Sequence, residues 1–307
     1  MNKMKLYVMA VLAMIVAGCS GSDEEALKPQ VSLKDTPIQV NVLLADIQTR
    51  AGYEGTNLPE MFYLRIDQPG DSYDYDVVMK HDENAAKWLS YTSADADASR
   101  IEMLWEGSTN TVAVTAATFP LTTTPYMPNV RADQSTDEGI KASDHLYYHS
   151  DAVEASGEGI SVTFAHFLSK LQIKITLGSE YEDEATNPIT AVTVLGTKLN
   201  ATYDPTTSAW SPPTGDADII SCPPATYSNL TATYEVILVP QTVAADSFTV
   251  QIQIGNKPYE WTSASAVTLE SGKQYTLELK AGKDKVSGNS FTATEWGSGD
   301  NQDMKTE

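Results

Sequence analysis

The chain has 307 residues and a formal net charge of −21, with 41% hydrophobic and 20% charged residues. Disordered chains and coiled coils contain more charge, so this composition excludes both classes. Duplex affinity comes mainly from Lys and Arg side chains that neutralise phosphates, so the acidic balance also excludes nucleic acid as a partner. The length allows two domains, each with its own core.

Residues 1–18 have the pattern of a secretory signal peptide. Lys3 and Lys5 form a basic head, and residues 6–17 are an uninterrupted apolar run. At about 1.5 Å per residue this run covers roughly 18 Å, too short for a hydrocarbon core of about 30 Å. The small residues before Cys19 resemble a bacterial lipobox, which implies that Cys19 is acylated, as by palmitate, and becomes the first mature residue. The alternative is an ordinary signal peptide followed by an incidental cysteine.

Residues 19–36 predict a polar, acidic tether, because a Ser-Gly-Ser-Asp-Glu-Glu run follows the cysteine. The negative charge of this tether disfavours contact with an anionic membrane surface. The run resembles the acidic export signal of surface lipoproteins in Bacteroidetes, and a plain solvated linker is the alternative. We therefore expect an outer-membrane lipoprotein at the cell surface that reaches the membrane through lipid. Cys222 is the only other cysteine, so stability must come from buried area rather than a disulfide.

From residue 37 onward the dominant hydrophobic period is two, as in a strand with one buried face. The first predicted strand carries its apolar side chains at Ile38, Val40, Val42 and Leu44. Further strands are predicted at residues 61–66, 73–79, 100–105, 111–119, 159–165, 171–177, 189–198, 233–239, 248–254, 266–269 and 275–280. Only residues 94–102 favour a helix. Many short strands separated by turn residues predict an all-β fold of antiparallel sandwiches.

The segment 122–159 is rich in Thr, Ser, Asp and Gly and lacks an apolar period. We therefore predict a domain boundary near residue 158. This divides the chain into an N-terminal β-sandwich over residues 37–158 and a C-terminal β-sandwich over residues 159–307.

Four features together resemble the fimbrillin superfamily of Bacteroidetes, the lipoprotein-derived subunits of type V pili. The first two are the lipobox with its acidic run and the Thr-Arg-Ala sequence at residues 49–51. The third is the stretch 162–171, similar to the family's Phe-x-His-x-Leu-x-Lys-Leu pattern. The fourth is a Leu-x-x-Gly-Lys-x-Tyr pattern at residues 269–275, followed by a last strand that closes at Trp296.

The resemblance implies two transthyretin-like antiparallel β-sandwich domains in tandem and a first strand that is removed, here residues 37–50. In this family an arginine-specific protease cuts behind that strand, and a strand from another pilus subunit fills the groove. On this chain the cut falls between Arg50 and Ala51. The side chains placed in the groove are Ile38, Val40, Val42 and Leu44. The alternative is a permanent edge strand with Arg50 in a surface loop.

The C-terminal end bears on the role of such a subunit. Stalk subunits of this family donate a C-terminal strand, but residues 297–307 are polar and acidic, and the residues before them offer little beyond Phe291 and Ala293. A poor donor favours a tip or accessory subunit in the fimbrium, supporting cell adhesion. Its partners would be other pilus subunits and a ligand on a host or bacterial surface.

The sequence carries no strong pattern for catalysis, a cofactor or a metal, and we expect no enzyme. His145 and His149 have the spacing of two ligands on a helix, but the residues between them favour a strand or loop. His166 fits a packed or hydrogen-bonded residue better than a base. The alternative function is a glycan-binding surface lipoprotein, since Trp88, Trp105, Trp210, Trp261 and the fifteen tyrosines could stack on sugars, although aromatic residues in β-sandwiches usually lie in the core.

Overall fold

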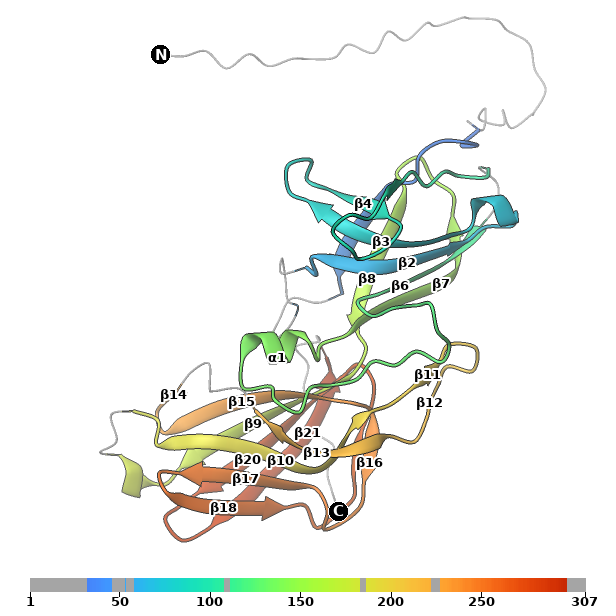
Figure 1. Ribbon diagram of the computed structural model, residues 1–307. Helices are drawn as coiled ribbons and strands as arrows, with labels where there is room; N and C mark the ends of the chain where they lie inside the picture. The colour runs from blue at the N-terminus through green and yellow to red at the C-terminus, as the bar shows by residue number, and fades with distance from the viewer. Residues whose placement is uncertain are drawn as a thin grey trace, which may run out of the picture. The chain divides into compact units, whose positions relative to one another are not determined.

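Strands make up nearly all of the regular structure of the chain (Figure 1). The computed structural model describes residues 32–45, 53, 58–107, 111–182, 186–221 and 227–296. The other elements are the helix α1 (Asp137–Lys141) and the 3-10 turns η1 (Asp71–Tyr73) and η2 (Ser179–Tyr181). The predicted all-β class is confirmed. Across these ranges, no helix is long and apolar enough to cross a membrane.

The first sheet has eight strands in the order β1-β8-β7-β6-β2-β3-β4-β5. Neighbours run antiparallel, except that β1 and β8 are parallel. The bounds are β1 Val40–Leu44, β2 Met61–Asp67, β3 Tyr75–Asp82, β4 Lys87–Tyr91, β5 Arg100–Ile101, β6 Thr111–Ala117, β7 Leu146–Glu154 and β8 Ile160–His166.

This sheet folds over itself around a hydrophobic cluster, which we call the first core. β7 and β8 pair only where Leu146 and Tyr147 meet the end of β8, so the rest of β8 diverges from β7 and carries β1 with it. Phe164 on β8 then contacts Phe62 on β2, with the ring centroids 5.2 Å apart. Both rings are buried in the first core with apolar side chains of β1, β3 and β6.

The later strands form two further sheets around a second core. Their orders are β14-β15-β9-β20-β21 and β13-β10-β17-β18, and the short pairs β11-β12 and β16-β19 complete this part. Ile173 on β9 and Ile252 on β17 come from different sheets and are fully buried in the same cluster. The bounds are β9 Ser169–Leu177, β10 Ile189–Asn200, β11 Tyr203–Asp204, β12 Ala209–Trp210, β13 Thr214–Ile220, β14 Tyr227–Ser228, β15 Thr231–Leu238, β16 Gln241–Val243, β17 Thr249–Ile254, β18 Lys257–Thr262, β19 Val267–Leu269, β20 Lys273–Ala281 and β21 Val286–Glu295.

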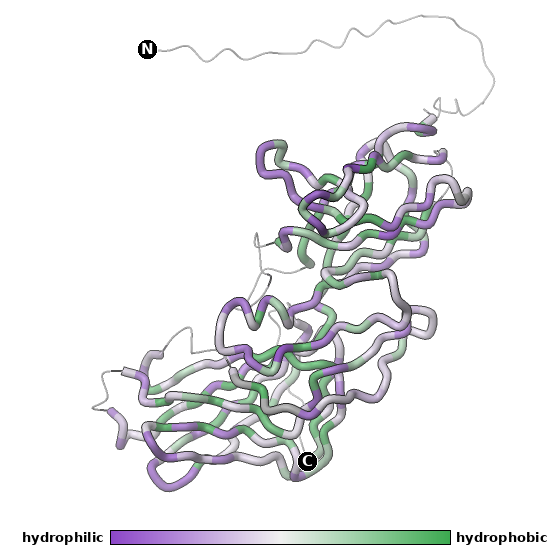
Figure 2. The backbone as a smooth tube through the Cα atoms, viewed as in Figure 1, coloured by the Kyte–Doolittle hydropathy of each residue, from purple (hydrophilic) through white to green (hydrophobic). Residues whose placement is uncertain are grey.

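Hydrophobic stretches follow the strands of both parts, while many connecting loops are hydrophilic (Figure 2). The alternation is clearest on β9, where every second side chain from Leu171 to Leu177 is buried. A third, smaller cluster of apolar side chains, the aromatic cluster, lies beside the passage from β8 to β9. It contains the buried rings of Phe119, Tyr126 and Phe167.

The strand pairing places the change from the first sheet to the later sheets after residue 158, where we predicted the domain boundary. β8 follows that point, yet it pairs with β1 and β7 and contributes Ile160 and Phe164 to the first core. β9 is the first strand of the second part, so the change of sheet falls at Phe167 and Leu168. The division into two tandem domains stays a prediction, and the pairing places β8 with the N-terminal strands.

One local prediction is wrong: residues 94–102 form turns and the short strand β5 instead of a helix. The segment 122–159, which lacks an apolar period, contains α1 and all of β7. α1 is capped by Thr136, whose side chain accepts a hydrogen bond from the backbone N–H of Gly139, and it buries only Ile140. One buried residue in a short helix leaves no periodic pattern to detect.

We expect Phe164→Ala to lower the free energy of unfolding by about 3–5 kcal/mol, because it empties a fully buried ring site against Phe62. Urea unfolding measures this loss. Met127→Ala is the control, since the Met127 side chain is 58% exposed and its loss changes the value by less than about 0.5 kcal/mol. Equal effects of the two substitutions would contradict the assignment of Phe164 to the first core.

Candidate functional site

The first strand, β1, lies at the edge of the first sheet and pairs in parallel with β8 from Val40↔Ile160 to Leu44↔Phe164. Bonds at both ends extend this ladder: the Ile160 N–H donates to the Gln39 carbonyl at 2.8 Å, and the Ala45 N–H to the Phe164 carbonyl at 2.7 Å. The pairing thus runs along nearly the whole of β8.

The residues just before β1 pair with a second segment. The Ile38 N–H donates to the carbonyl of Met103 at 2.8 Å, and the Trp105 N–H donates to that of Thr36 at 3.0 Å. This explains why only Arg100–Ile101 of the predicted strand 100–105 belongs to β5: the residues that follow turn to the N-terminal segment. The first strand is therefore held between two parts of the chain.

Side chains of the first strand alternate between the core and the solvent. Ile38, Val40 and Val42 are 7%, 6% and 9% exposed and belong to the first core. Leu44 is half-buried against the same cluster, whereas Leu43 on the opposite face is 57% exposed. The four residues that the sequence placed in the groove thus all point to one apolar cluster. Their role as a replaceable strand stays a prediction.

Three other predicted site residues lie outside the described residues: Cys19, Arg50 and Ala51. Tyr53, shortly after the predicted cut, is described. Its backbone N–H donates to Asp144 Oδ2 at 2.8 Å. The chain downstream of Arg50 is therefore attached to a buried carboxylate next to β7.

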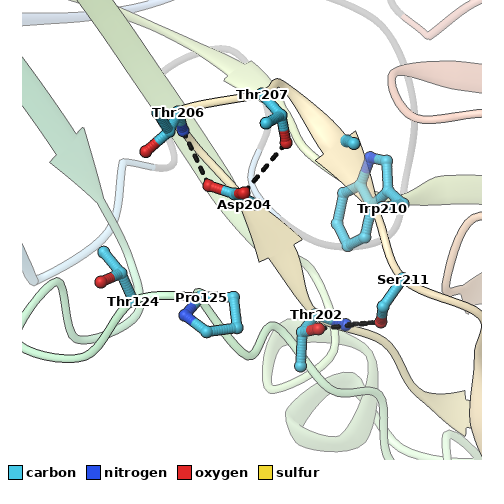
Figure 3. A pocket seen from close by; sticks show the side chains of 9 residues that line it. Thr124, Pro125, Thr202, Asp204, Thr206, Thr207, Trp210 and Ser211 are labelled. Atoms are coloured by element: carbon cyan, nitrogen blue, oxygen red, sulfur yellow. Dashed lines mark hydrogen bonds between the residues drawn. The ribbon is translucent and has the colours of Figure 1, made fainter.

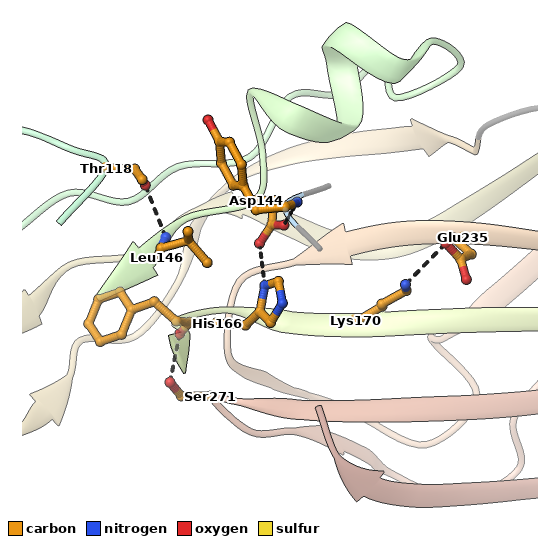
Figure 4. A network of polar contacts seen from close by, with 9 residues as sticks. Thr118, Asp144, Leu146, His166, Lys170, Glu235 and Ser271 are labelled. Atoms are coloured by element: carbon orange, nitrogen blue, oxygen red, sulfur yellow. Dashed lines mark hydrogen bonds and ion pairs between the residues drawn. The ribbon is translucent and has the colours of Figure 1, made fainter. Parts of the chain in front are cut away.

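Asp144 is the centre of a polar network that joins residues far apart in sequence (Figure 4). Its carboxylate is fully buried, and Oδ1 contacts His166 Nδ1 at 2.8 Å. The imidazole of His166 stacks on the indole of Trp296 with 3.8 Å between centroids and 4° between planes. The network connects the N-terminal segment at Tyr53, the end of β8 and the residue that follows β21.

Residues of the two later sequence patterns, 162–171 and 269–275, form hydrogen bonds with each other. The hydroxyl of Ser271 donates to the Phe167 carbonyl at 2.6 Å, and the Gly272 N–H donates to the Leu168 carbonyl at 2.9 Å. Gly272 has a φ of +72°, which favours glycine, and its own carbonyl accepts from the Trp296 N–H at 2.8 Å. The Phe-x-His-x-Leu-x-Lys-Leu and Leu-x-x-Gly-Lys-x-Tyr patterns therefore form one structural clamp where the chain changes sheet.

Lys170, the charged residue of the first pattern, is fully buried. Its Nζ lies 3.1 Å from Glu235 Oε2 on the neighbouring strand β15 and 5.9 Å from the centroid of the Trp296 ring. A buried ammonium requires such partners, because desolvation without compensation is very costly. Lys170 therefore has a structural role beside the clamp.

The two spaced histidines do not converge on a common point. His145 Nε2 contacts the Asn129 carbonyl at 2.9 Å, and burial lowers the pKa of His145. His149 on β7 contacts Thr115 Oγ1 and Asp151 Oδ1 instead. Within the described ranges, no group of three or more His, Cys, Asp or Glu side chains could hold a metal ion.

Sequence reasoning missed Asp144 and the aromatic cluster. Asp144 comes from a loop between α1 and β7, and its partners lie 91 and 22 residues away in sequence. The aromatic cluster gathers rings from several loops and short strands, including Phe119, Phe167 and Trp210. Neither arrangement follows a local period, so only the folded topology brings these side chains together.

We expect Asp144→Asn to lower the free energy of unfolding by about 2–3 kcal/mol, because the buried carboxylate accepts hydrogen bonds from both Tyr53 and His166. The matched control is Asp151→Asn, whose side chain is 88% exposed and also contacts a histidine. Chemical unfolding of both variants measures the difference. A neutral effect of Asp144→Asn would show that the network does not stabilise the fold.

Comparisons with known proteins agree with this architecture. The sequence model of the fimbrillin-like family matches residues 69–296. A candidate cell adhesion protein from Bacteroides ovatus is 17% identical, with a TM-score of 0.60 over 89% of this chain and 99% of that one. The tip fimbrial protein Mfa3 from Porphyromonas gingivalis, with a C-terminal truncation, is 9% identical, with a TM-score of 0.50 over 85% of this chain and 100% of that one.

A third similar structure, a candidate cell adhesion protein from Bacteroides uniformis, is 16% identical, with a TM-score of 0.54 over 85% of this chain and 100% of that one. No curated protein matches the sequence. At these identities the structures show a shared fold, whereas the family match spans most of the chain and confirms the resemblance seen in the sequence. The chain belongs to the fimbrillin-like family.

Proposed function

We propose that the protein is a subunit of a type V pilus that assembles by loss of its first strand and capture of a strand from another subunit. One observation carries this proposal: β1 supplies the ladder partners of β8 from Ile160 to Phe164. Within the described residues, β7 pairs with β8 only at its far end. Loss of β1 would leave the backbone groups along that stretch unpaired, and unpaired edges capture other strands.

The apolar part of the groove supports the same step. Burial of an aliphatic side chain stabilises by about 1.5–3 kcal/mol, so Ile38, Val40 and Val42 together contribute on the order of 5–9 kcal/mol before ordering costs. This is comparable with the whole stability of a typical domain, about 5–15 kcal/mol. An emptied groove would strongly favour any incoming strand with the same alternation.

Proteolysis provides the trigger in this proposal. An arginine-specific protease cuts between Arg50 and Ala51, in the chain between the end of β1 and Tyr53. The Tyr53 N–H bond to Asp144 keeps the new N-terminal end attached to the polar network around Asp144. Only the segment before the cut then leaves, and the rest of the first core stays in place.

Localisation and role complete the proposal. Acylation of Cys19 and the acidic tether bring the precursor to the outer membrane and the cell surface, and the mature subunit joins the fimbrium. The mature subunit consists of two tandem transthyretin-like sandwiches that meet at residues 167–168. A tip or accessory position is favoured because the C-terminal strand β21 already packs Phe291 and Ala293 against the second core.

In a mixture with a pilus subunit that donates a strand, we expect digestion of this chain with an arginine-specific protease to yield a new N-terminus at Ala51 and SDS-resistant multimers. Arg50→Lys preserves the positive charge but removes the cleavage site, so it should abolish both products. N-terminal sequencing and gel electrophoresis measure them. Assembled material that begins at Cys19, or cleavage at Arg50 that leaves only monomers, would contradict the proposal.

We expect a peptide of residues 36–45, added in excess during digestion, to suppress multimer formation, because it refills the groove. The same peptide with V40D and V42D should be inactive, since carboxylates would enter an apolar cluster. A peptide with L43D is the matched control, because Leu43 faces solvent. Electrophoresis of the digests compares the three peptides. Equal inhibition by all of them would show that binding in the groove does not depend on the alternation of apolar side chains.

A further inference from the structure

An open hollow lies beside the aromatic cluster, and none of the described residues that line it belongs to β1 or β8. It has a volume of about 760 Å³ and is lined by residues of β7, β11, β12, β16 and β19, including Tyr147, Tyr203 and Trp210, and by Glu270, which follows β19. We call it the aromatic hollow. A second hollow of about 450 Å³ adjoins it, and Trp210 and Ser211 line both. Trp210 therefore separates two connected depressions of the surface.

The rings of the aromatic hollow are fixed in place by one buried side chain. Phe167 is 6% exposed and contacts Tyr147 at 4.5 Å, Tyr203 at 4.9 Å and Trp210 at 4.9 Å between ring centroids. Tyr203 and Trp210 also contact each other directly across the β11-β12 pair. The half-buried rings thus form a preorganised platform, which lowers the entropic cost of binding a ligand.

Several polar groups of this platform have no hydrogen-bond partner among the described residues. In the part of the chain that the structure describes, no hydrogen bond engages the hydroxyls of Tyr147 and Tyr203, the indole N–H of Trp210 or the carboxylate of Glu270. Burial raises the pKa of Tyr147, so its hydroxyl stays protonated and can donate. Donors and acceptors therefore belong to the same residues and the same hollow as the apolar ring faces.

The second hollow adds more hydroxyl groups (Figure 3). Thr124 and Pro125 lie across from Trp210 and Ser211, and Asp204 lies near the tip of the β11-β12 hairpin. Asp204 accepts hydrogen bonds from the Thr206 N–H and the Thr207 hydroxyl, which holds the hairpin rigid. A ligand long enough to pass Trp210 would contact both hollows.

The chemistry of the lining selects the class of ligand. Neither Lys nor Arg is among the described residues that line the two hollows, and the chain is strongly acidic, so an anionic ligand is disfavoured. A purely apolar ligand would leave Glu270 and the tyrosine hydroxyls unmatched. A proline-rich peptide offers carbonyls but few N–H donors, and these carbonyls would face the Glu270 carboxylate.

A sugar ring matches every part of the lining. Its C–H groups carry slight positive charge and pack on the negative face of an aromatic ring, while its hydroxyls both donate and accept hydrogen bonds. We propose that the aromatic hollow binds a neutral oligosaccharide, with one sugar ring stacked on Trp210 and its hydroxyls bonded to Glu270 and Tyr203. This site is separate from the groove of β1, so its failure would leave the proposed assembly unaffected.

The test is calorimetric titration of the full chain with four neutral probes: cellohexaose, xylohexaose, mannohexaose and N-acetylchitohexaose. We expect at least one to bind and to change the tryptophan fluorescence. Trp210→Ala should weaken that binding at least about tenfold, because it removes the stacking surface. Trp88→Ala, which alters a hollow on β4 in the first sheet, should leave the affinity within about twofold.

Milder variants keep the test valid if Trp210→Ala disturbs the aromatic cluster. Tyr203→Phe and Glu270→Gln each remove one polar group and should weaken binding about three- to tenfold while the unfolding midpoint stays unchanged. Failure of all four probes to bind at millimolar concentration would overturn the proposal. So would binding that depends on Trp88 instead of Trp210, or binding of decaproline in place of the oligosaccharides.

Discussion

The parallel ladder between β1 and β8 is the interaction on which the N-terminal sheet depends. β8 separates from β7 after a short shared end, and this separation lets Phe164 reach Phe62 and closes the first core. The cost is a strand whose backbone needs another partner over most of its length. β1 is that partner, and it is the strand that the proposed exchange would replace. Closure of the core and the proposed exchange of the first strand thus involve the same ladder.

The polar network around Asp144 would let the proposed exchange leave the rest of the fold intact. Asp144 binds Tyr53 and His166, and His166 stacks on Trp296. The segment after the predicted cut, the end of β8 and the residue after β21 are therefore fixed at one place. In the proposed exchange, removal of β1 would break the ladder but not this attachment, so the core would open from one edge while the passage between the sheets stays closed.

The sequence predicted those features that repeat along a strand and missed those that depend on distant contacts. The alternation of Ile38, Val40 and Val42 predicted their burial on one face, because a strand places every second side chain on the same side. β7 was missed because most of its side chains are exposed or half-buried and give no apolar period. The clamp could be recognised as a family pattern, but its contacts could not be derived, since Ser271 binds a carbonyl 104 residues away.

The aromatic hollow and the groove of β1 differ in their surface chemistry and in whether they are filled. In the proposed assembly, the groove of β1 would expose its apolar side chains only after the strand is removed, so it would stay filled until then. The hollow exposes rings in small patches edged by polar groups, and such a surface remains soluble while it stays open. Phe167 belongs to the aromatic cluster and also accepts the Ser271 bond of the clamp. The same passage between the sheets therefore belongs both to the clamp and to the proposed sugar platform.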